Sequence, residues 1–516
     1  MPFTLSRRNV LAGALSGTIA HWAGSAAAAA APGPLSLGPP RPFGFDGLKR
    51  QAQALARTPQ APRPVLDADI LDAIDYDAYG QIAYRPELTL WNSAPGAQPV
   101  RLFPLGRYFK EPVAIHLLER GQARQVLYSP DLFETPAGHP LRRLKQGGFA
   151  GFRLMSPGGR SDWLAFLGAS YFRSSDPFDQ YGASARGLAI NSGGPAAEEF
   201  PRFSAFWLEQ DGHGGLTVYA LMESPSVVGA FSFGNRRGPA GAVQRIETAL
   251  YFRRPVETLG LAPLTSMFWY GANSNGPRPD WRPQVHDSDG LAIWTGADER
   301  IWRPLNDPPR ATRNSFLDHR PKGFGLAQRD RSFEDYQDDS VFYEKRPTLW
   351  VEPLTDWGAG AVGLVELPTV GETDDNVVAF WTPAQKIQAG STLDAAYNLH
   401  WVAEDPPAAD GARVVSTRIG PGGRPGLAPR PGARKFVIDL AGPALEGLTR
   451  ASGVRAIVTA SRGHVDNVSA YPVVGTHRWR LMFDLSDVGG QTADLRAYLD
   501  RNGQALSESW LYQAFP

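Results

Sequence analysis

The amino-acid sequence predicts an all-β protein composed of a large and a small β-sandwich. The chain contains 55 glycines and 45 prolines among 516 residues, and 11% of its residues are aromatic. This composition is typical of many strands and turns rather than long helices. Short apolar or alternating runs, such as 112–119 and 163–172, are separated by Gly, Pro and Asp, which favours antiparallel strands joined by long loops. Because the chain has no cysteine, its core must be large enough to hold without disulfides.

Residues 1–31 predict an export signal. Adjacent arginines, Arg7 and Arg8, precede a short apolar run, and alanines fill 26–31. Paired arginines ahead of such a run are typical of twin-arginine secretory signals. The apolar stretch is shorter than the ~20 residues that a membrane span needs, and it is interrupted by Gly, Ser and Thr. We therefore expect a periplasmic mature chain with no membrane span.

Two short helices are expected before the first strands. Asp46 can cap a helix that runs to about Arg57, and Asp67 can cap a second one. The large sandwich is expected to span 32–382. A linker is expected over 383–394, where Pro383 and Gly390 fall close together.

Residues 395–516 are expected to form an immunoglobulin-like β-sandwich. Clear strand patterns occupy 435–440, 454–460 and 478–485, and the last of these alternates apolar and polar positions. About 120 residues of this kind fit one such sandwich.

Charge and motifs exclude several functions. The chain has 52 basic and 52 acidic residues, so it lacks the basic excess that favours nucleic-acid or anionic-lipid binding. No phosphate-binding loop or dinucleotide motif occurs, and the stretch from Asp287 to Gly290 does not fit a calcium loop. The nine histidines show no metal-ligand spacing. We expect no cofactor, no metal and no nucleic-acid partner.

Aromatic and charged residues gather between 266 and 401. This segment holds eight of the 14 tryptophans, interleaved with carboxylates and arginines. Aromatic rings cover the apolar faces of sugars while charged groups bond to hydroxyls, so a sugar-binding cleft is one interpretation. A stacked aromatic core with surface ion pairs is the other. On the first interpretation the rings line an elongated groove near the domain junction, in particular Trp281, Trp302, Trp350 and Trp381.

Ordered motifs across the chain resemble the periplasmic glucan biosynthesis family OpgG/OpgD (MdoG/MdoD). They are FGFDGLKRQA (43–52), TSMFWYG (265–271), VHDSDGL (285–291), IWRPLN (301–306), KGFGL (322–326), QRDR (328–331), YQDD (336–339), RPTLWVEP (346–353) and ETDDNVVAFW (372–381). The paired arginines favour the OpgD branch.

The resemblance implies a galactose-mutarotase-like large sandwich joined to the immunoglobulin-like one. It also implies a role in making osmoregulated periplasmic glucans, whose backbone is β-1,2-linked glucose. The implied activity is that of an anomer-inverting β-1,2-glucanase or of a cyclising transglycosylase. The alternative is a non-catalytic glucan-binding chaperone that assists the membrane glucosyltransferase OpgH.

The resemblance also assigns candidate site residues. Asp375 corresponds to the general acid and Asp287 to the base, as inverting glycosidases require. Asp374 and Asp375 are adjacent, so on a strand only one of them can enter a cleft. The loop over 421–435 corresponds to a segment that covers the cleft. The residues expected to contact substrate are Glu372, Tyr343, Asp339, Arg346, Trp350 and Trp381.

Overall fold

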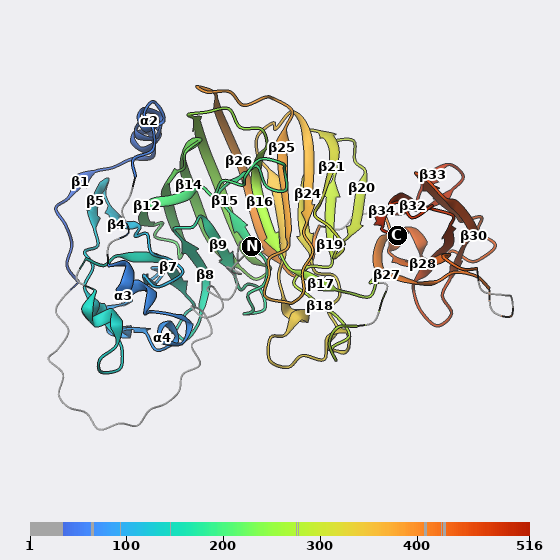
Figure 1. The fold of residues 1–516 in the computed structure, drawn as a ribbon, viewed down its shortest axis with the longest axis horizontal. Coiled ribbons are helices and arrows are strands. Elements are labelled where there is room, and N and C mark those ends of the chain that lie inside the picture. Colours follow the sequence, from blue (N-terminus) through green and yellow to red (C-terminus); the bar gives the residue numbers. More distant parts are fainter. Residues whose placement is uncertain are drawn as a thin grey trace.

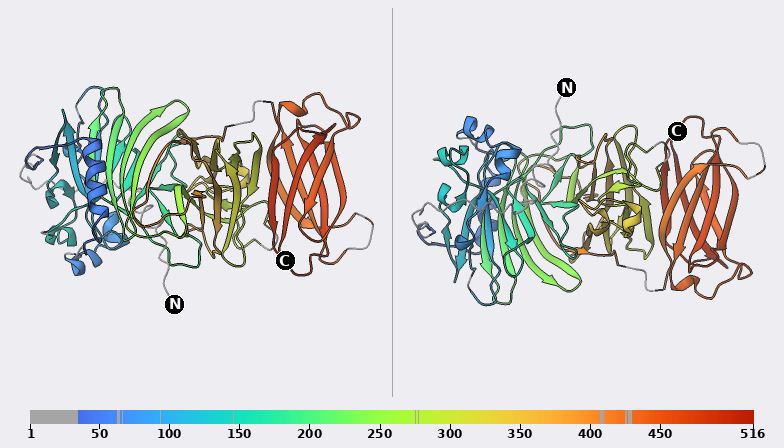
Figure 2. Two further views of the ribbon diagram at one scale, coloured as in Figure 1. Left: turned by 90° about the horizontal axis from the view of Figure 1, so that it is seen from above. Right: turned by 90° about the horizontal axis from the view of Figure 1, so that it is seen from below.

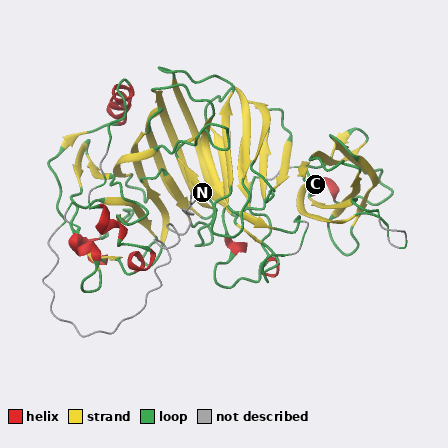
Figure 3. Cartoon of the chain, in the orientation of Figure 1, coloured by secondary structure: helices red, strands yellow, loops and turns green. Residues whose placement is uncertain are grey.

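The computed structural model describes residues 35–516, except 63, 64, 66, 93, 145, 275, 277, 407–409, 425 and 427–429. The predicted signal at 1–31 therefore lies outside the described residues. The chain forms a large body of extended sheets with a smaller C-terminal sandwich at one end (Figures 1 and 2). Strands predominate (Figure 3), which confirms the predicted all-β class with a large and a small sandwich. None of the helices within the described part of the chain is long and apolar enough to cross a membrane.

The larger sheet contains 16 strands and continues from the large body into the C-terminal sandwich. Its longest strands, β14 and β15, form an antiparallel hairpin. The strands across this sheet are β1 (Arg41–Pro42), β5 (Gln122–Gln125), β4 (Ala114–Glu119), β12 (Arg202–Gln210), β13 (Leu216–Glu223), β14 (Val227–Gly238), β15 (Gly241–Phe252), β26 (Thr392–Val402), β23 (Thr348–Pro353), β22 (Gly323–Ala327), β19 (Gly290–Trp294), β20 (Arg300–Pro304), β34 (Ser509–Ala514), β32 (Ala493–Arg501) and β29 (Arg455–Ala460), with β33 (Gln504–Ala505) beside β32.

The second sheet contains ten strands. They are β21 (Thr312–His319), β24 (Ala359–Glu366), β25 (Val377–Pro383), β16 (Leu259–Ser266), β10 (Ser184–Arg186), β9 (Tyr171–Ser174), β8 (Asp162–Leu167), β7 (Phe149–Met155) and β3 (Val100–Pro104), with β11 (Ala189–Ile190) beside β16. Phenylalanines join the two sheets in one core. The ring of Phe166 on β8 lies 5.2 Å from that of Phe233 on β14 and 6.1 Å from that of Phe206 on β12.

The helices are short and lie outside the sheets. The predicted first helix is α2 (Phe45–Ala56), which buries Leu48 and Ala52 against the larger sheet. The predicted second helix is α3 (Ala68–Asp72), followed by α4 (Tyr76–Gly80). The 3₁₀ turns are η1 (Pro86–Leu88), η2 (Pro130–Leu132), η3 (Pro140–Arg143), η4 (Phe333–Asp335), η5 (Tyr343–Lys345) and η6 (Pro443–Leu445). Two small strand pairs also form, β2 (Ala83–Tyr84) with β6 (Phe133–Glu134), and β17 (Phe268–Tyr270) with β18 (Val285–His286).

The C-terminal sandwich packs a four-stranded sheet against β34, β32 and β29. The four strands are β27 (Arg413–Pro421), β28 (Arg434–Ala441), β31 (Trp479–Ser486) and β30 (His464–Pro472). Three of these seven strands, β28, β29 and β31, coincide with the predicted strand patterns. The rings of Phe436 and Phe483 stack at 5.0 Å, and Trp510 meets both edge to face.

The predicted domain boundary is wrong. The first residues assigned to the C-terminal sandwich, from 395 on, belong to β26, which pairs with β15 on one side and β23 on the other within the large sheet. The chain therefore leaves the large body after Val402, and 383–394 is no linker between domains.

The two sandwiches share more than a connecting segment. β20 pairs in parallel with β34, with Ile301 opposite Ser509 and Trp302 opposite Trp510. The same hydrophobic cluster contains Trp302 and the core of the C-terminal sandwich.

Candidate active site

The loop between β24 and β25 carries three carboxylates and is anchored by Asn376. The Asn376 Nδ2 donates to the carbonyl oxygens of Phe268 and Leu367, both at 2.9 Å. The Phe268 amide donates back to Asn376 Oδ1 at 2.8 Å. Because this side chain is buried, the loop is held against β17 immediately beside Asp375.

Arg282 fixes Glu372. Its Nη1 lies 2.8 Å from Glu372 Oε2 and 2.8 Å from Asp338 Oδ2, and its Nη2 lies 2.6 Å from Asp280 Oδ2. Burial alone would lower the pKa of Arg282, but the hydrogen bonds to these carboxylates outweigh burial, so its pKa is raised. The Tyr343 hydroxyl also donates to Glu372 Oε2. Glu372 is thus held by defined hydrogen-bond donors.

Asp374 and Asp375 have different surroundings. Asp374 Oδ2 accepts a hydrogen bond from Thr369 Oγ1 at 3.4 Å, within the same loop. Asp375 instead interacts electrostatically with Arg186 at the end of β10. Burial would lower the pKa of Arg186, but nearby groups that include Glu198 and Asp375 outweigh burial, and its pKa is raised. The Arg186 Nη1 lies 2.8 Å from Glu198 Oε1.

Asp287 lies directly after β18 and is fully buried. Its amide donates to the Met267 carbonyl at 2.9 Å. The Arg346 guanidinium lies close to its carboxylate, with Nε 3.7 Å from Asp287 Oδ1. The same guanidinium lies 5.2 Å from the centre of the Tyr343 ring, so Arg346 links Asp287 to the tyrosine that bonds to Glu372.

His286, the residue before Asp287, forms with Phe268 a buried wall of stacked rings. Its ring stacks on Phe268 at 5.4 Å and lies with Nδ1 3.0 Å from Gln328 Oε1. Burial lowers the pKa of His286 to about 4, although Gln328 and Asp287 act in the opposite direction. The imidazole is therefore neutral near pH 7.

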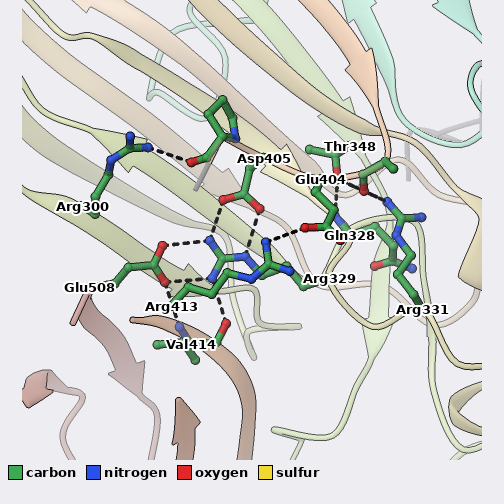
Figure 4. A network of polar contacts seen from close by, with 12 residues as sticks. Arg300, Gln328, Arg329, Arg331, Thr348, Glu404, Asp405, Arg413, Val414 and Glu508 are labelled. Atoms are coloured by element: carbon green, nitrogen blue, oxygen red, sulfur yellow. Dashed lines mark hydrogen bonds and ion pairs between the residues drawn. The ribbon is translucent and has the colours of Figure 1, made fainter. Parts of the chain in front are cut away.

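The segment 328–331 connects this wall to the C-terminal sandwich (Figure 4). The Arg329 Nη2 lies 2.6 Å from Asp405 Oδ2, and its Nη1 lies 2.9 Å from Glu508 Oε2 and 2.8 Å from the Val414 carbonyl oxygen. A small cavity of about 30 Å³ lies next to it, between the two sandwiches. Asp289 and Asp330 line this cavity, and burial raises the pKa of both.

Comparison with known proteins gives this geometry a context. The family described as "Periplasmic glucan biosynthesis protein, MdoG" matches residues 43–514. Glucans biosynthesis protein D 2 of Ralstonia nicotianae is 45% identical over 530 residues, which cover 99% of this chain and 98% of that protein. Glucans biosynthesis protein D of Xanthomonas axonopodis pv. citri is 46% identical over 508 residues, which cover 97% and 95%.

The chain belongs to the MdoG family. Its relatives of type D place it in the OpgD branch. The family description includes the periplasm and glucan biosynthesis. A galactose mutarotase related enzyme from Lactobacillus acidophilus aligns with 49% of this chain and 94% of its own, with 8% identity and a TM-score of 0.15, which is too low to carry an argument.

The structure brings together some, but not all, of the site residues that the resemblance to the MdoG family predicts. Asp287, Arg346, Tyr343 and Glu372 form the connected set described above, and Asp375 lies on the same loop as Glu372. Asp339 is exposed on the surface. Among the described residues, no group of three or more His, Asp or Glu side chains is arranged to hold a metal.

Two tryptophans predicted to contact substrate are buried instead. Trp381 has no exposed surface and belongs to the core between the two sheets, and Trp350 lies in the cluster shared with the C-terminal sandwich. The Trp350 ring lies against Gly323 and Gly325, where a Cβ atom would clash with it. With Trp302 also buried, the prediction that these rings line a groove is wrong for three of the four. Only Trp281 is exposed, at 72%.

The loop over 421–435 bonds within its own sandwich. The Gly423 amide donates to Asp484 Oδ2 at 2.9 Å, and Arg424 Nε donates to Asn467 Oδ1 at 2.7 Å. The described residues of this loop therefore have partners away from the candidate site, contrary to the expectation that it covers a cleft.

Sequence reasoning missed the residues that hold the site together. Arg186, Arg282 and Asn376 position the carboxylates, yet none of them stands out from composition or spacing. Gln328 was noted only as part of a family motif. Its structural role could have been predicted, because a glutamine directly after a fully apolar strand is expected to be buried and to need hydrogen-bond partners.

Proposed function

We propose that this MdoG-family protein acts on β-1,2-linked glucan in the periplasm as an anomer-inverting glucanase or a related cyclising transglycosylase. Asp375 serves as general acid and Asp287 as base. The observation that carries the proposal is the convergence of three distant segments. Arg346 lies between Asp287 and Tyr343, and Tyr343 bonds to Glu372 on the loop of Asp375.

Exposed aromatic rings beside the charged groups support a sugar ligand. Trp281 is 72% exposed next to Arg282, which holds Glu372. Phe200 is 44% exposed, and its ring lies 5.6 Å from the guanidinium of Arg186, the neighbour of Asp375. Apolar sugar faces stack on such rings while the adjacent charges bond to hydroxyls. Each of the two rings is thus next to an arginine that interacts with a carboxylate of the loop between β24 and β25.

The chemistry requires one proton donor and one proton acceptor. The Asp375 carboxyl gives its proton to the glycosidic oxygen as the bond to the anomeric carbon breaks. A water molecule attacks that carbon from the opposite face, and its proton passes to Asp287, directly or through intervening hydroxyls. In the transglycosylase variant a sugar hydroxyl replaces the water, and a new glycosidic bond forms.

A second candidate function is a glucan-binding chaperone that assists the membrane glucosyltransferase OpgH. The observation in its favour is that Glu372 and Asp287 both lie close to arginines. Carboxylates held by arginines in this way can accept hydrogen bonds from sugar hydroxyls without taking part in a reaction.

The deciding experiment incubates purified protein with linear β-1,2-glucan and follows product size and anomeric configuration. Asp375→Asn is expected to lose ~10²–10⁴-fold in rate, because an amide cannot donate the proton, while glucan binding is retained. Asp287→Asn is expected to be similarly impaired. Asp374→Asn is the matched control, since its side chain bonds within the loop. An active Asp375→Asn beside an inactive Asp374→Asn would refute the assignment, and binding without turnover in the wild type would favour the chaperone.

A further inference from the structure

Gln328 is a buried glutamine that contacts two segments of the candidate site at once. It has no exposed surface and follows β22 directly. Its Nε2 donates to the Tyr343 carbonyl at 3.1 Å and to the Tyr336 hydroxyl at 2.8 Å, and its Oε1 lies 3.0 Å from His286 Nδ1. Its amide therefore touches the residue before Asp287 and the backbone of the tyrosine that bonds to Glu372.

The wall that Gln328 supports extends to the acid-bearing loop. His286 stacks on Phe268 at 5.4 Å. The backbone of Phe268 exchanges two hydrogen bonds with the side-chain amide of Asn376, the residue after Asp375. Displacing the His286 ring would shift both carboxylates of the proposed pair, because each is covalently adjacent to a member of this wall.

Arg329, the next residue, extends the connection to the C-terminal sandwich. Its guanidinium is buried between Asp405 and Glu508, and its face lies 3.7 Å from the centre of the Trp302 ring. Glu508 Oε2 also accepts the Val414 amide at 2.9 Å. Two consecutive residues thus have different partners, because Gln328 contacts His286 and Tyr343 of the candidate site and Arg329 contacts Glu508 of the second sandwich.

We propose that Gln328 is a positioning residue for Asp287 and Tyr343, and that Arg329 makes this position depend on the docking of the C-terminal sandwich. The inference rests on the proposed function for its kinetic readout. Its physical content is separate, because the contacts of His286 can be followed without any substrate. The second sandwich acts at a distance, through the hydrogen bonds that Arg329 makes to Val414 and Glu508 and through the backbone that joins Arg329 to Gln328.

The first test replaces Gln328. Gln328→Leu keeps the approximate volume but removes the hydrogen bonds to His286 and Tyr343. We expect kcat on β-1,2-glucan to fall about 10- to 100-fold, since a misplacement of about 1 Å has such an effect, with KM changed less than about threefold. Gln328→Glu provides a second variant, because it keeps an acceptor at His286 Nδ1 and adds a negative charge there.

The second readout is the titration of His286 by NMR of labelled histidine, assigned with His286→Gln. In the wild type the ring stays neutral between pH 5 and 8, in keeping with its lowered pKa. The carboxylate of Gln328→Glu favours the imidazolium, so the ring is expected to titrate within that window. An unchanged titration together with an unchanged kcat would overturn the inference.

The domain link is tested with Arg329→Lys, which keeps the charge but loses the two-pronged geometry. We expect a fall in kcat in the same sense as for Gln328→Leu. Arg496→Met is the matched control, since Arg496 on β32 pairs with Glu299 of the large body at 2.6 Å across the same junction, and its kcat is expected to stay within about twofold. A lower melting temperature of Arg329→Lys with unchanged kcat would refute the link. A wild type without turnover refutes the proposed function, and the titration then decides the inference alone.

Discussion

Trp281 is an exposed ring directly before Arg282, which belongs to the charged centre of the candidate site. It is 72% exposed, and its neighbour Arg282 holds Glu372. A ring in this position adds little to the folded core, because most of its surface stays in contact with solvent. Its contribution is therefore expected in ligand binding rather than in stability.

Trp281→Ala is expected to raise KM for β-1,2-glucan about 3- to 10-fold, the effect of losing one stacking contact. The melting temperature should be unchanged. Tyr76→Ala is the matched control, since Tyr76 is 49% exposed on α4, away from the site residues. Steady-state kinetics and thermal melts measure both variants, and an unaltered KM for Trp281→Ala would contradict the proposed platform.

The ionised carboxylate of Asp289 is expected to lower the free energy of unfolding. Burial and the neighbouring charge of Asp330 raise its pKa, whereas its carboxyl in the unfolded chain titrates near 3.9. The unfolded state therefore releases its proton first, and folding stability falls as the pH rises above about 4 until the folded carboxyl also ionises.

Asp289→Asn mimics the protonated form and removes this dependence. Relative to the wild type, the variant is expected to gain melting temperature steadily from pH 5 to pH 8. Scanning calorimetry at several pH values measures the difference. A difference that is independent of pH would show that the carboxyl is not the titrating group.

At the scale of elements, the loop between β24 and β25 depends on one side chain. Asn376 makes three hydrogen bonds to backbone groups of Phe268 and Leu367. Replacing Asn376 leaves buried backbone groups unpaired, which costs about 1–3 kcal/mol per group. The loop would then no longer hold Glu372 and Asp375 in register with β17.

Asn376→Ala is expected to lower the melting temperature by several degrees and to reduce kcat more than it changes KM. Thr373→Ala is the control, because Thr373 is exposed in the same loop and should alter neither quantity. Equal behaviour of the two variants would show that the anchor is dispensable.

Strands were easier to predict than their partners. Residues from 395 on are expected in the C-terminal sandwich, yet β26 lies in the large sheet, because an alternating pattern suits a strand of either sandwich. Its place between β15 and β23 is set by residues about 150 positions earlier and 50 positions earlier. Trp381 was misread for a related reason, since composition reports an aromatic cluster but not the face of the strand that carries it.

At the scale of the molecule, the fold class, the two sandwiches and the family were predictable, because ordered motifs extend across the chain. The junction between the two sandwiches could not be predicted, because it depends on ion pairs of Arg329 with Asp405 and Glu508, which come from distant segments of the chain. Twin-arginine export, which moves folded proteins, suits a molecule whose parts are joined in this way. The signal itself lies outside the described residues.

Replacing Arg7 and Arg8 together by lysine is expected to retain the precursor in the cytoplasm. Cell fractionation followed by immunoblotting measures the distribution of the protein. Normal periplasmic accumulation of the double variant would show that the chain uses another export route.

The pairing of β20 with β34 has a consequence for how the chain is made. Trp302 lies opposite Trp510, so one edge of the large sheet stays open while the ribosome adds the roughly 200 residues between them. During that interval the nascent chain presents an unpaired strand edge, the kind of surface that invites aggregation. Folding of the large body is thus completed only after β34 has emerged, and chaperone protection of β20 during translation would be of direct benefit.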